Sequence, residues 1–127
     1  MPTEQQIATA LLTIANAAVA PVVAYEPSKV PATKPAEFVT LALVRRSGGS
    51  PRSGRYVTTG WALYVMAASK ISEVNARLRH EKVAAALESR TLTVDGIKST
   101  PIKFDSARPV GPDDGYSTGV RVYHFTL

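Results

Sequence analysis

The chain has 127 residues, of which 15 are lysine or arginine and 10 are aspartate or glutamate, and it contains no cysteine. This length is typical of one domain, so residues 1–127 are expected to form a single domain. The lack of cysteine excludes disulfides, thiolate zinc sites, iron–sulfur clusters and thiol nucleophiles. The net charge of +5 fits an anionic partner such as nucleic acid, but charge alone does not identify one.

The first predicted element is an alanine-rich helix that begins after Thr3. Thr3 and Gln6 have the spacing of a capping box, and Pro21 ends the helix because proline has no backbone N–H. One apolar stripe predicts that the helix packs against a sheet; it consists of Ile7, Leu11 and Ile14. Residues 5–25 carry no charge, yet they hold too many polar residues for a membrane span and lack the basic start of a signal peptide. We therefore expect an intracellular, soluble protein.

A long β-hairpin is predicted after a short strand at residues 22–25 and a proline-rich connector. Its first strand covers residues 38–45, where apolar and β-branched residues concentrate. Residues 45–55 read RRSGGSPRSGR, a stretch too poor in apolar residues to offset the entropy of ordering, so a mobile tip is expected. The second strand is apolar on both faces after Gly60, as in a covered central strand, and Trp61 is expected in its core.

Four of the five net positive charges lie on this hairpin tip. The segment of residues 45–60 carries no acidic residue, and its basic residues are Arg45, Arg46, Arg52 and Arg55. Such a tip is either a solvated turn or an arm that contacts phosphates without reading sequence. The absence of an aromatic residue between residues 45 and 55 disfavours single-strand binding, because no ring can stack on bases.

A second helix is predicted over residues 69–89, with Ser69 or Ser72 as its N-cap. Its main apolar stripe consists of Ile71, Val74, Leu78 and Ala85. Val83 and Leu87 lie on the opposite side at about 100° per residue. Either a bend or a loop covers this second face, or the face is a subunit interface.

The last third of the chain is predicted to be mostly strand. Asp95-Gly96 indicates a tight turn between strands at residues 91–94 and 97–104, because type I′ turns require positive φ. Residues 105–117, rich in glycine and proline, are predicted as a loop, and residues 118–127 as a closing strand. Together the elements predict an α+β fold: a mainly antiparallel sheet with two helices packed on it and a long β-hairpin with a mobile basic tip.

Few side chains of this sequence are suited to catalysis. His80 is expected to be solvated on the charged face of the second helix, and His124 to be a hydrogen-bonded structural residue. The acidic pair at residues 113–114 lacks the spacing of a calcium-binding EF-hand. Walker, GxSxG and HExxH motifs do not occur. We expect no enzymatic activity, no catalytic or metal site and no cofactor.

The order of these elements resembles that of the tail terminator proteins of long-tailed (siphovirus-like) bacteriophages. Residues 60–65, GWALYV, and the helix that follows look like the family's central strand and helix. Residues 119–125, GVRVYHF, look like its closing strand. The resemblance is one of pattern and length, and it covers most of the chain.

The resemblance implies a structural virion protein, assembled in the host cytoplasm, at the head-proximal end of the phage tail. There it would form a hexameric ring that terminates polymerisation of the tail tube, joins the tail to the head–tail connector and leaves an axial channel for DNA. The implied partners are further copies of the chain, the tail tube protein and the connector protein. In such a ring Val83 and Leu87 would lie at a subunit interface, and the four tip arginines would contact DNA in the channel or a neighbouring ring.

Two alternatives stay open at this point. The first is another head–tail connector or neck (head-completion) protein, because small α+β ring subunits of this junction share size and pattern. The second, from a different class, is a basic nucleic-acid-binding module, for which the tip arginines would supply phosphate contacts.

Overall fold

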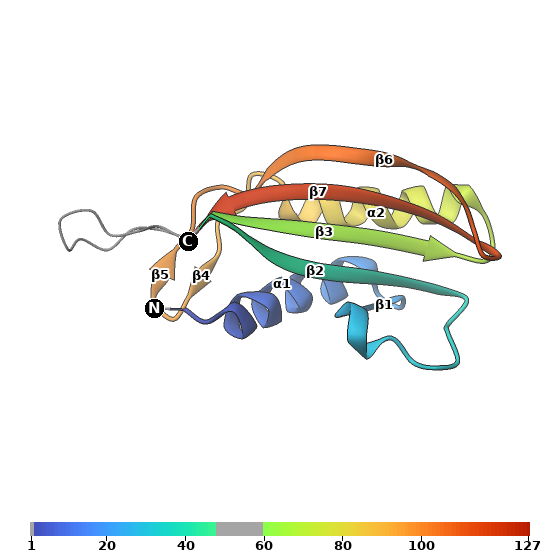
Figure 1. Cartoon of the computed structure of the whole chain (residues 1–127), viewed down its shortest axis with the longest axis horizontal. Coiled ribbons are helices and arrows are strands. Elements are labelled where there is room, and N and C mark those ends of the chain that lie inside the picture. The colour runs from blue at the N-terminus through green and yellow to red at the C-terminus, as the bar shows by residue number, and fades with distance from the viewer. Residues whose placement is uncertain (1, 48–59) are drawn as a thin grey trace.

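A computed structural model describes residues 2–47 and 60–127 of the chain. Its main feature is a five-stranded sheet in the order β1-β2-β3-β7-β6, accompanied by two helices and a small β4-β5 ribbon (Figure 1). The elements are α1 Glu4–Val19, β1 Val23–Tyr25, the 3-10 turn η1 Pro27–Lys29, β2 Glu37–Ser47, β3 Gly60–Ser69, α2 Glu73–Leu87, β4 Thr93–Val94, β5 Ile97–Lys98, β6 Lys103–Asp113 and β7 Tyr116–Thr126. Strand neighbours in the large sheet are antiparallel except β1 and β2, which are parallel. The predicted α+β class is confirmed, whereas residues 48–55 of the predicted hairpin tip lie outside the described residues.

Helix α1 begins with the predicted capping box. The Gln6 backbone N–H donates to Thr3 Oγ1 at 3.1 Å, and the Thr3 backbone N–H donates to Gln6 Oε1 at 2.8 Å. The buried side of the helix is formed by Ile7, Leu11, Ala15 and Val19. In the last turns of the helix, the Asn16 side chain accepts from the Ala24 N–H at 2.9 Å and donates to the Ala24 carbonyl at 3.2 Å. These two bonds fix β1 beside the helix.

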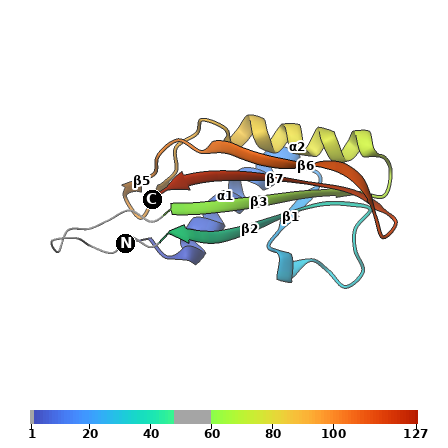
Figure 2. The ribbon, with the colours of Figure 1, turned by 45° about the horizontal axis from the view of Figure 1, so that its top comes forward.

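The core lies between the two helices and one face of the sheet. Side chains alternate along a strand, so the odd-numbered residues of β2, β3 and β7 share this face, as the register Leu41↔Val65 shows. Both helices lie on the same side of the sheet and pack against each other (Figure 2). The largest fully buried side chains are Tyr123, Ile7, Leu11, Leu63, Leu87, Ile102, Val19, Val39, Val65 and Val83. Trp61, at 6% exposure, belongs to the same core, as predicted.

Helix α2 turns a different side to the core than the sequence predicted. Its buried residues are Ala76, His80, Val83, Ala84 and Leu87, a stripe of helical spacing that a histidine interrupts. Val83 and Leu87 are 0% exposed in the single chain, so their assignment to a subunit interface was wrong. The predicted packing stripe is instead exposed, at 65% for Ile71, 67% for Val74 and 41% for Leu78.

The prediction of a loop at residues 105–117 was also wrong. This segment forms most of β6, the turn that follows it and the first residues of β7. Asp114 and Gly115 make its turn with φ of 48° and 81°. Its prolines indicated an irregular segment. However, β6 is an edge strand, and proline is tolerated there because the N–H groups on the outer side of an edge strand have no partner strand to bind. The Asp95-Gly96 turn is confirmed, with φ of 51° and 75°, although the strands on its two sides are shorter than predicted.

Candidate functional site

Two of the four tip arginines lie in the described part of the chain. Arg45 and Arg46 are exposed near the end of β2, where Arg45 pairs across the sheet with Trp61 and a β-bulge follows. Arg52 and Arg55 lie outside the described residues. The predicted contact surface made by all four arginines therefore stays a prediction.

Arg46 of β2 forms an ion pair with Asp105 of β6, although β3 and β7 lie between these strands in the sheet. Its Nη1 atom lies 3.2 Å from Oδ2 of Asp105, and His124 Nδ1 lies 3.9 Å from the same oxygen. Both side chains of the arginine pair are well exposed, so the pair contributes about 0 to 1 kcal/mol. A hollow of about 690 Å³ opens beside them, with Lys103 and the partly exposed His124 in its wall. This end of the sheet is basic, as the sequence predicts for its hairpin.

A smaller basic pocket of about 200 Å³ lies between α2 and the β6–β7 hairpin. Its charged lining is made by Arg77, Arg108 and Arg121, and its floor includes His80. His80 is 2% exposed, which corrects its prediction as a solvated residue, and its Nε2 donates to the Gly119 carbonyl at 2.7 Å. Burial lowers the pKa of His80, and the Arg121 charge lowers it further, against the raising effect of the Gly119 bond. The ring is therefore a neutral structural donor.

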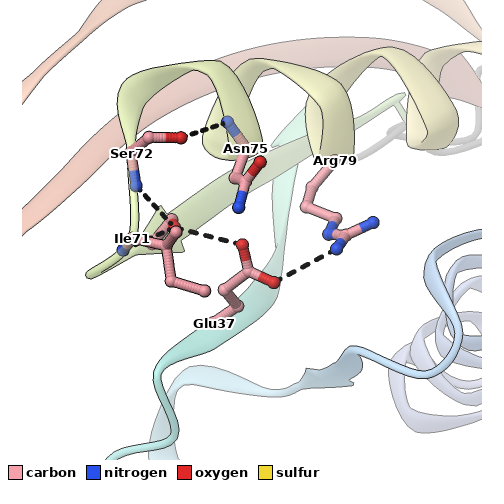
Figure 3. A network of polar contacts seen from close by, with 6 residues as sticks. Glu37, Ile71, Ser72, Asn75 and Arg79 are labelled. Atoms are coloured by element: carbon pink, nitrogen blue, oxygen red, sulfur yellow. Dashed lines mark hydrogen bonds and ion pairs between the residues drawn. The ribbon is translucent and has the colours of Figure 1, made fainter.

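A nearly buried ion pair joins the middle of α2 to the start of β2 (Figure 3). Arg79 Nη2 donates to Glu37 Oε2 at 3.1 Å, and the Ser69 hydroxyl donates to Glu37 Oε1 at 3.1 Å. Ser69 Oγ in turn accepts from the backbone N–H groups of Ile71 and Ser72. Burial raises the pKa of Glu37, but the bonds from Arg79 and Ser69 outweigh it and hold the pKa below its ordinary value. This network is structural, because both charges are already paired.

Large apolar side chains are exposed on both sides of the molecule. On the sheet face opposite the helices, Val44 and Tyr64 are 46% and 43% exposed. On the helical side, the exposed residues are Ile71, Val74 and Leu78. No described element of the chain covers either surface.

The described residues contain no group of three His, Cys, Asp or Glu side chains placed to hold a metal ion. None of the helices in that part of the chain has the length and apolarity of a membrane span.

Comparison with known proteins finds a fold relative but no sequence relative. No family model and no curated protein matches the chain. A chain from the virion of the native gene transfer agent (GTA) particle aligns over 96% of this chain and 94% of its own length, with a TM-score of 0.75 and 13% identity. The fold is shared with a virion protein. At this identity the likeness establishes the α+β fold and carries over no individual residue.

Sequence reasoning missed the groups that the fold assembles from distant segments. Glu37 and Arg79 are 42 positions apart, and Arg77 reaches the same pocket as Arg121 from another element. The only local signal was His80, a polar residue in line with the apolar Val83 and Leu87. A histidine within an apolar stripe of helical spacing indicates a buried, hydrogen-bonded ring.

Proposed function

We propose that the chain is a structural subunit of a phage-like virion and that it acts as a tail terminator. In this role it forms a hexameric ring at the head-proximal end of the tail tube, ends tube polymerisation and joins the tail to the head–tail connector. The observation that carries the proposal is the match of the whole fold to a chain of the GTA virion, with a TM-score of 0.75. Because 96% of one chain and 94% of the other align, the likeness extends over the whole fold and is not limited to a motif.

The exposed surfaces of the chain support a ring. A cyclic assembly uses heterologous contacts, in which one surface of a subunit meets a different surface of the next. The chain offers two apolar surfaces on opposite sides of the sheet, one around Tyr64 and one around Val74. Two different surfaces on one subunit are what a heterologous contact between neighbouring copies requires.

Tail length is the measurement that tests this function. Particles assembled without the protein are expected to have overlong tubes without heads, because nothing stops polymerisation. Tubes of normal length that fail to join heads would contradict the terminator role and identify a neck or head-completion protein instead. Complete, infectious particles would contradict both.

A nucleic-acid-binding module is the competing function, and the pocket formed by Arg77, Arg108 and Arg121 favours it. Each phosphate contact releases counterions, so binding by the module would weaken steeply with salt. Free duplex DNA is titrated at several salt concentrations with the chain, with a variant in which Arg77, Arg108 and Arg121 are alanine, and with a variant in which the four tip arginines are alanine. Rings that form without salt-sensitive binding exclude the module, whereas tight binding by a monomer supports it.

A further inference from the structure

Strand β2 is paired along only part of its outer edge. Strand β1 pairs with it at Phe38, Val39 and Thr40. Within the described residues, no strand and no other backbone hydrogen bond occupies that side of residues 41–47. An unpaired strand edge presents a row of N–H and C=O groups that another strand can use.

A groove of about 540 Å³ lies on this free edge. Leu41 and Leu43 form its wall on the side of the sheet, and α1 and η1 form the other walls. Its charged lining consists of the carboxylates Glu4 and Glu26 against the single ammonium of Lys29. The Gln5 side chain donates to Glu26 Oε1 at 3.3 Å and holds that carboxylate at the rim. A groove with a free backbone edge and an excess of carboxylates fits an extended segment that carries basic side chains.

Strand β6 of a second copy is an extended segment of this kind, with basic side chains. It is the other edge of the sheet, and its residues 103–109 are exposed on both faces. Pro109 has no N–H, so the part able to pair is residues 103–108. This part carries Lys103 and Arg108, and its one acid, Asp105, is bound to Arg46 of its own chain.

Strand directions and register also agree. Three antiparallel pairings separate β2 from β6, so the two strands run in opposite directions. A rotation that builds a ring turns each copy without inverting it, so β6 of one copy meets β2 of the next antiparallel. Arg108 lies in the cross-strand row of Thr40, whose β1 partner is Tyr25, the residue before Glu26. Because Tyr25 already occupies this row on the β2 edge, the neighbour is placed two residues further along β2, which sets Arg108 opposite Ala42 and next to Glu26.

We propose that β6 of one subunit adds to the free edge of β2 of the next, so that the sheet continues around the ring and Arg108 pairs with Glu26 across the contact. The β-bulge between Arg108 and Gly111 ends this pairing where β1 begins to occupy the β2 edge. This inference rests on the proposed ring-forming function, which supplies the second copy as the occupant.

A charge exchange tests the contact. Glu26→Arg and Arg108→Glu are each expected to raise the dissociation constant of the assembly at least about tenfold, because each places like charges opposite one another. The double variant is expected to recover assembly, since it restores an opposite pair. Glu81→Arg and Lys98→Glu change exposed charges away from both edges and serve as matched controls. Mass is measured by light scattering across a concentration series, and circular dichroism verifies folding.

Hydrogen exchange gives an independent readout that does not depend on the variants. The backbone amides of residues 41–44 and 103–108 are expected to exchange more slowly in the assembled protein than in dilute monomer. Rings that persist in both single variants, or a double variant that does not recover, would overturn this contact and leave the terminator function standing. Protein that is monomeric at every concentration, with unchanged exchange, would overturn the contact; tail length would then decide the function separately.

Discussion

At the scale of single residues, the polar groups of this chain act mainly by joining elements. Glu37 accepts from Arg79 of α2 and from Ser69 of β3, so one carboxylate joins three elements. Its side chain and that of Arg79 are 12% and 14% exposed, so neither charge is well solvated if the other is removed. Removing one partner is therefore costly to stability, because the other charge is left nearly buried and unpaired.

Replacing Glu37 by glutamine keeps the shape of the side chain and removes its charge. The free energy of unfolding is expected to fall by about 2 kcal/mol, because Arg79 is left partly buried without a counter-charge. Because the pKa of Glu37 is lowered on folding, the native chain also loses this stabilisation as the pH falls below the ordinary value of 4.5, and the variant has none to lose. Urea unfolding at several pH values measures both effects. Glu73→Gln, in an exposed pair with Arg77, is the control and should change stability by under about 0.5 kcal/mol.

His80 gives stability a second dependence on pH. Burial lowers its pKa in the folded chain, so the unfolded chain binds a proton more readily. Stability is therefore complete above the ordinary pKa of 6.5 and declines as the pH falls through the lowered folded value. His80→Gln keeps a side-chain N–H for the Gly119 carbonyl and should flatten this decline in urea unfolding between neutral pH and the acid transition of Glu37. An unchanged slope would contradict the neutral, donating ring.

Gly119 is required by the same packing. A Cβ at this position would lie 2.8 Å from Val110 Cγ2 and 3.2 Å from His80 Nε2, whereas one at Gly111 would meet nothing within 4 Å. Gly119→Ala is expected to reduce the free energy of unfolding by about 1 to 3 kcal/mol, and Gly111→Ala to change it little. Equal midpoints in thermal unfolding of the two variants would show that the β6–β7 hairpin moves away from α2 at no cost.

At the scale of elements, local signals predicted α1, β3 and the Asp95-Gly96 turn, because caps, hydrophobic runs and turn residues act over a few positions. The orientation of α2 and the existence of β6 could not be predicted in this way. α2 has apolar residues on two sides, and contact with α1 and the sheet decides which of them is buried. For β6, Pro109 and Pro112 indicate a loop unless the strand is known to lie at an edge. Polar groups behave likewise: Arg45 and Arg46 could be named as exposed basic residues from the sequence, and their role stays a prediction, whereas the structural Glu37–Arg79 pair needed the fold.

A matched pair of leucines measures the orientation of α2. Leu87 is 0% exposed and Leu78 is 41% exposed on the other side of the helix. Leu87→Ala is expected to cost about 2 to 5 kcal/mol of unfolding free energy through lost burial and a cavity. Leu78→Ala is expected to cost under about 1 kcal/mol in dilute monomer. If urea unfolding showed a larger loss of stability for Leu78→Ala than for Leu87→Ala, the orientation indicated by the sequence pattern would be the correct one.

At the scale of the whole molecule, several surfaces of the single chain are not covered by its own elements. The sheet face around Tyr64, the outer side of α2 and both sheet edges have no cover within the described residues. Four of the five net charges belong to the hairpin segment, so the body of the molecule repels its own copies little. In the proposed ring, a subunit of this kind would gain stability from its neighbours.

Its thermal midpoint should therefore rise with protein concentration. Association that occurs only in the folded state stabilises it by mass action, by up to about 2.7 kcal/mol at a hundred times the dissociation constant. Scanning calorimetry over a concentration series is expected to show this rise for the native chain and for the Glu26→Arg/Arg108→Glu double variant. The two single variants are expected to show a much smaller rise, while retaining the midpoint of the dilute native protein because both side chains lie at the sheet edges. A midpoint independent of concentration for every variant would mean that the exposed surfaces serve other partners, with the tail tube and the connector protein the first to examine.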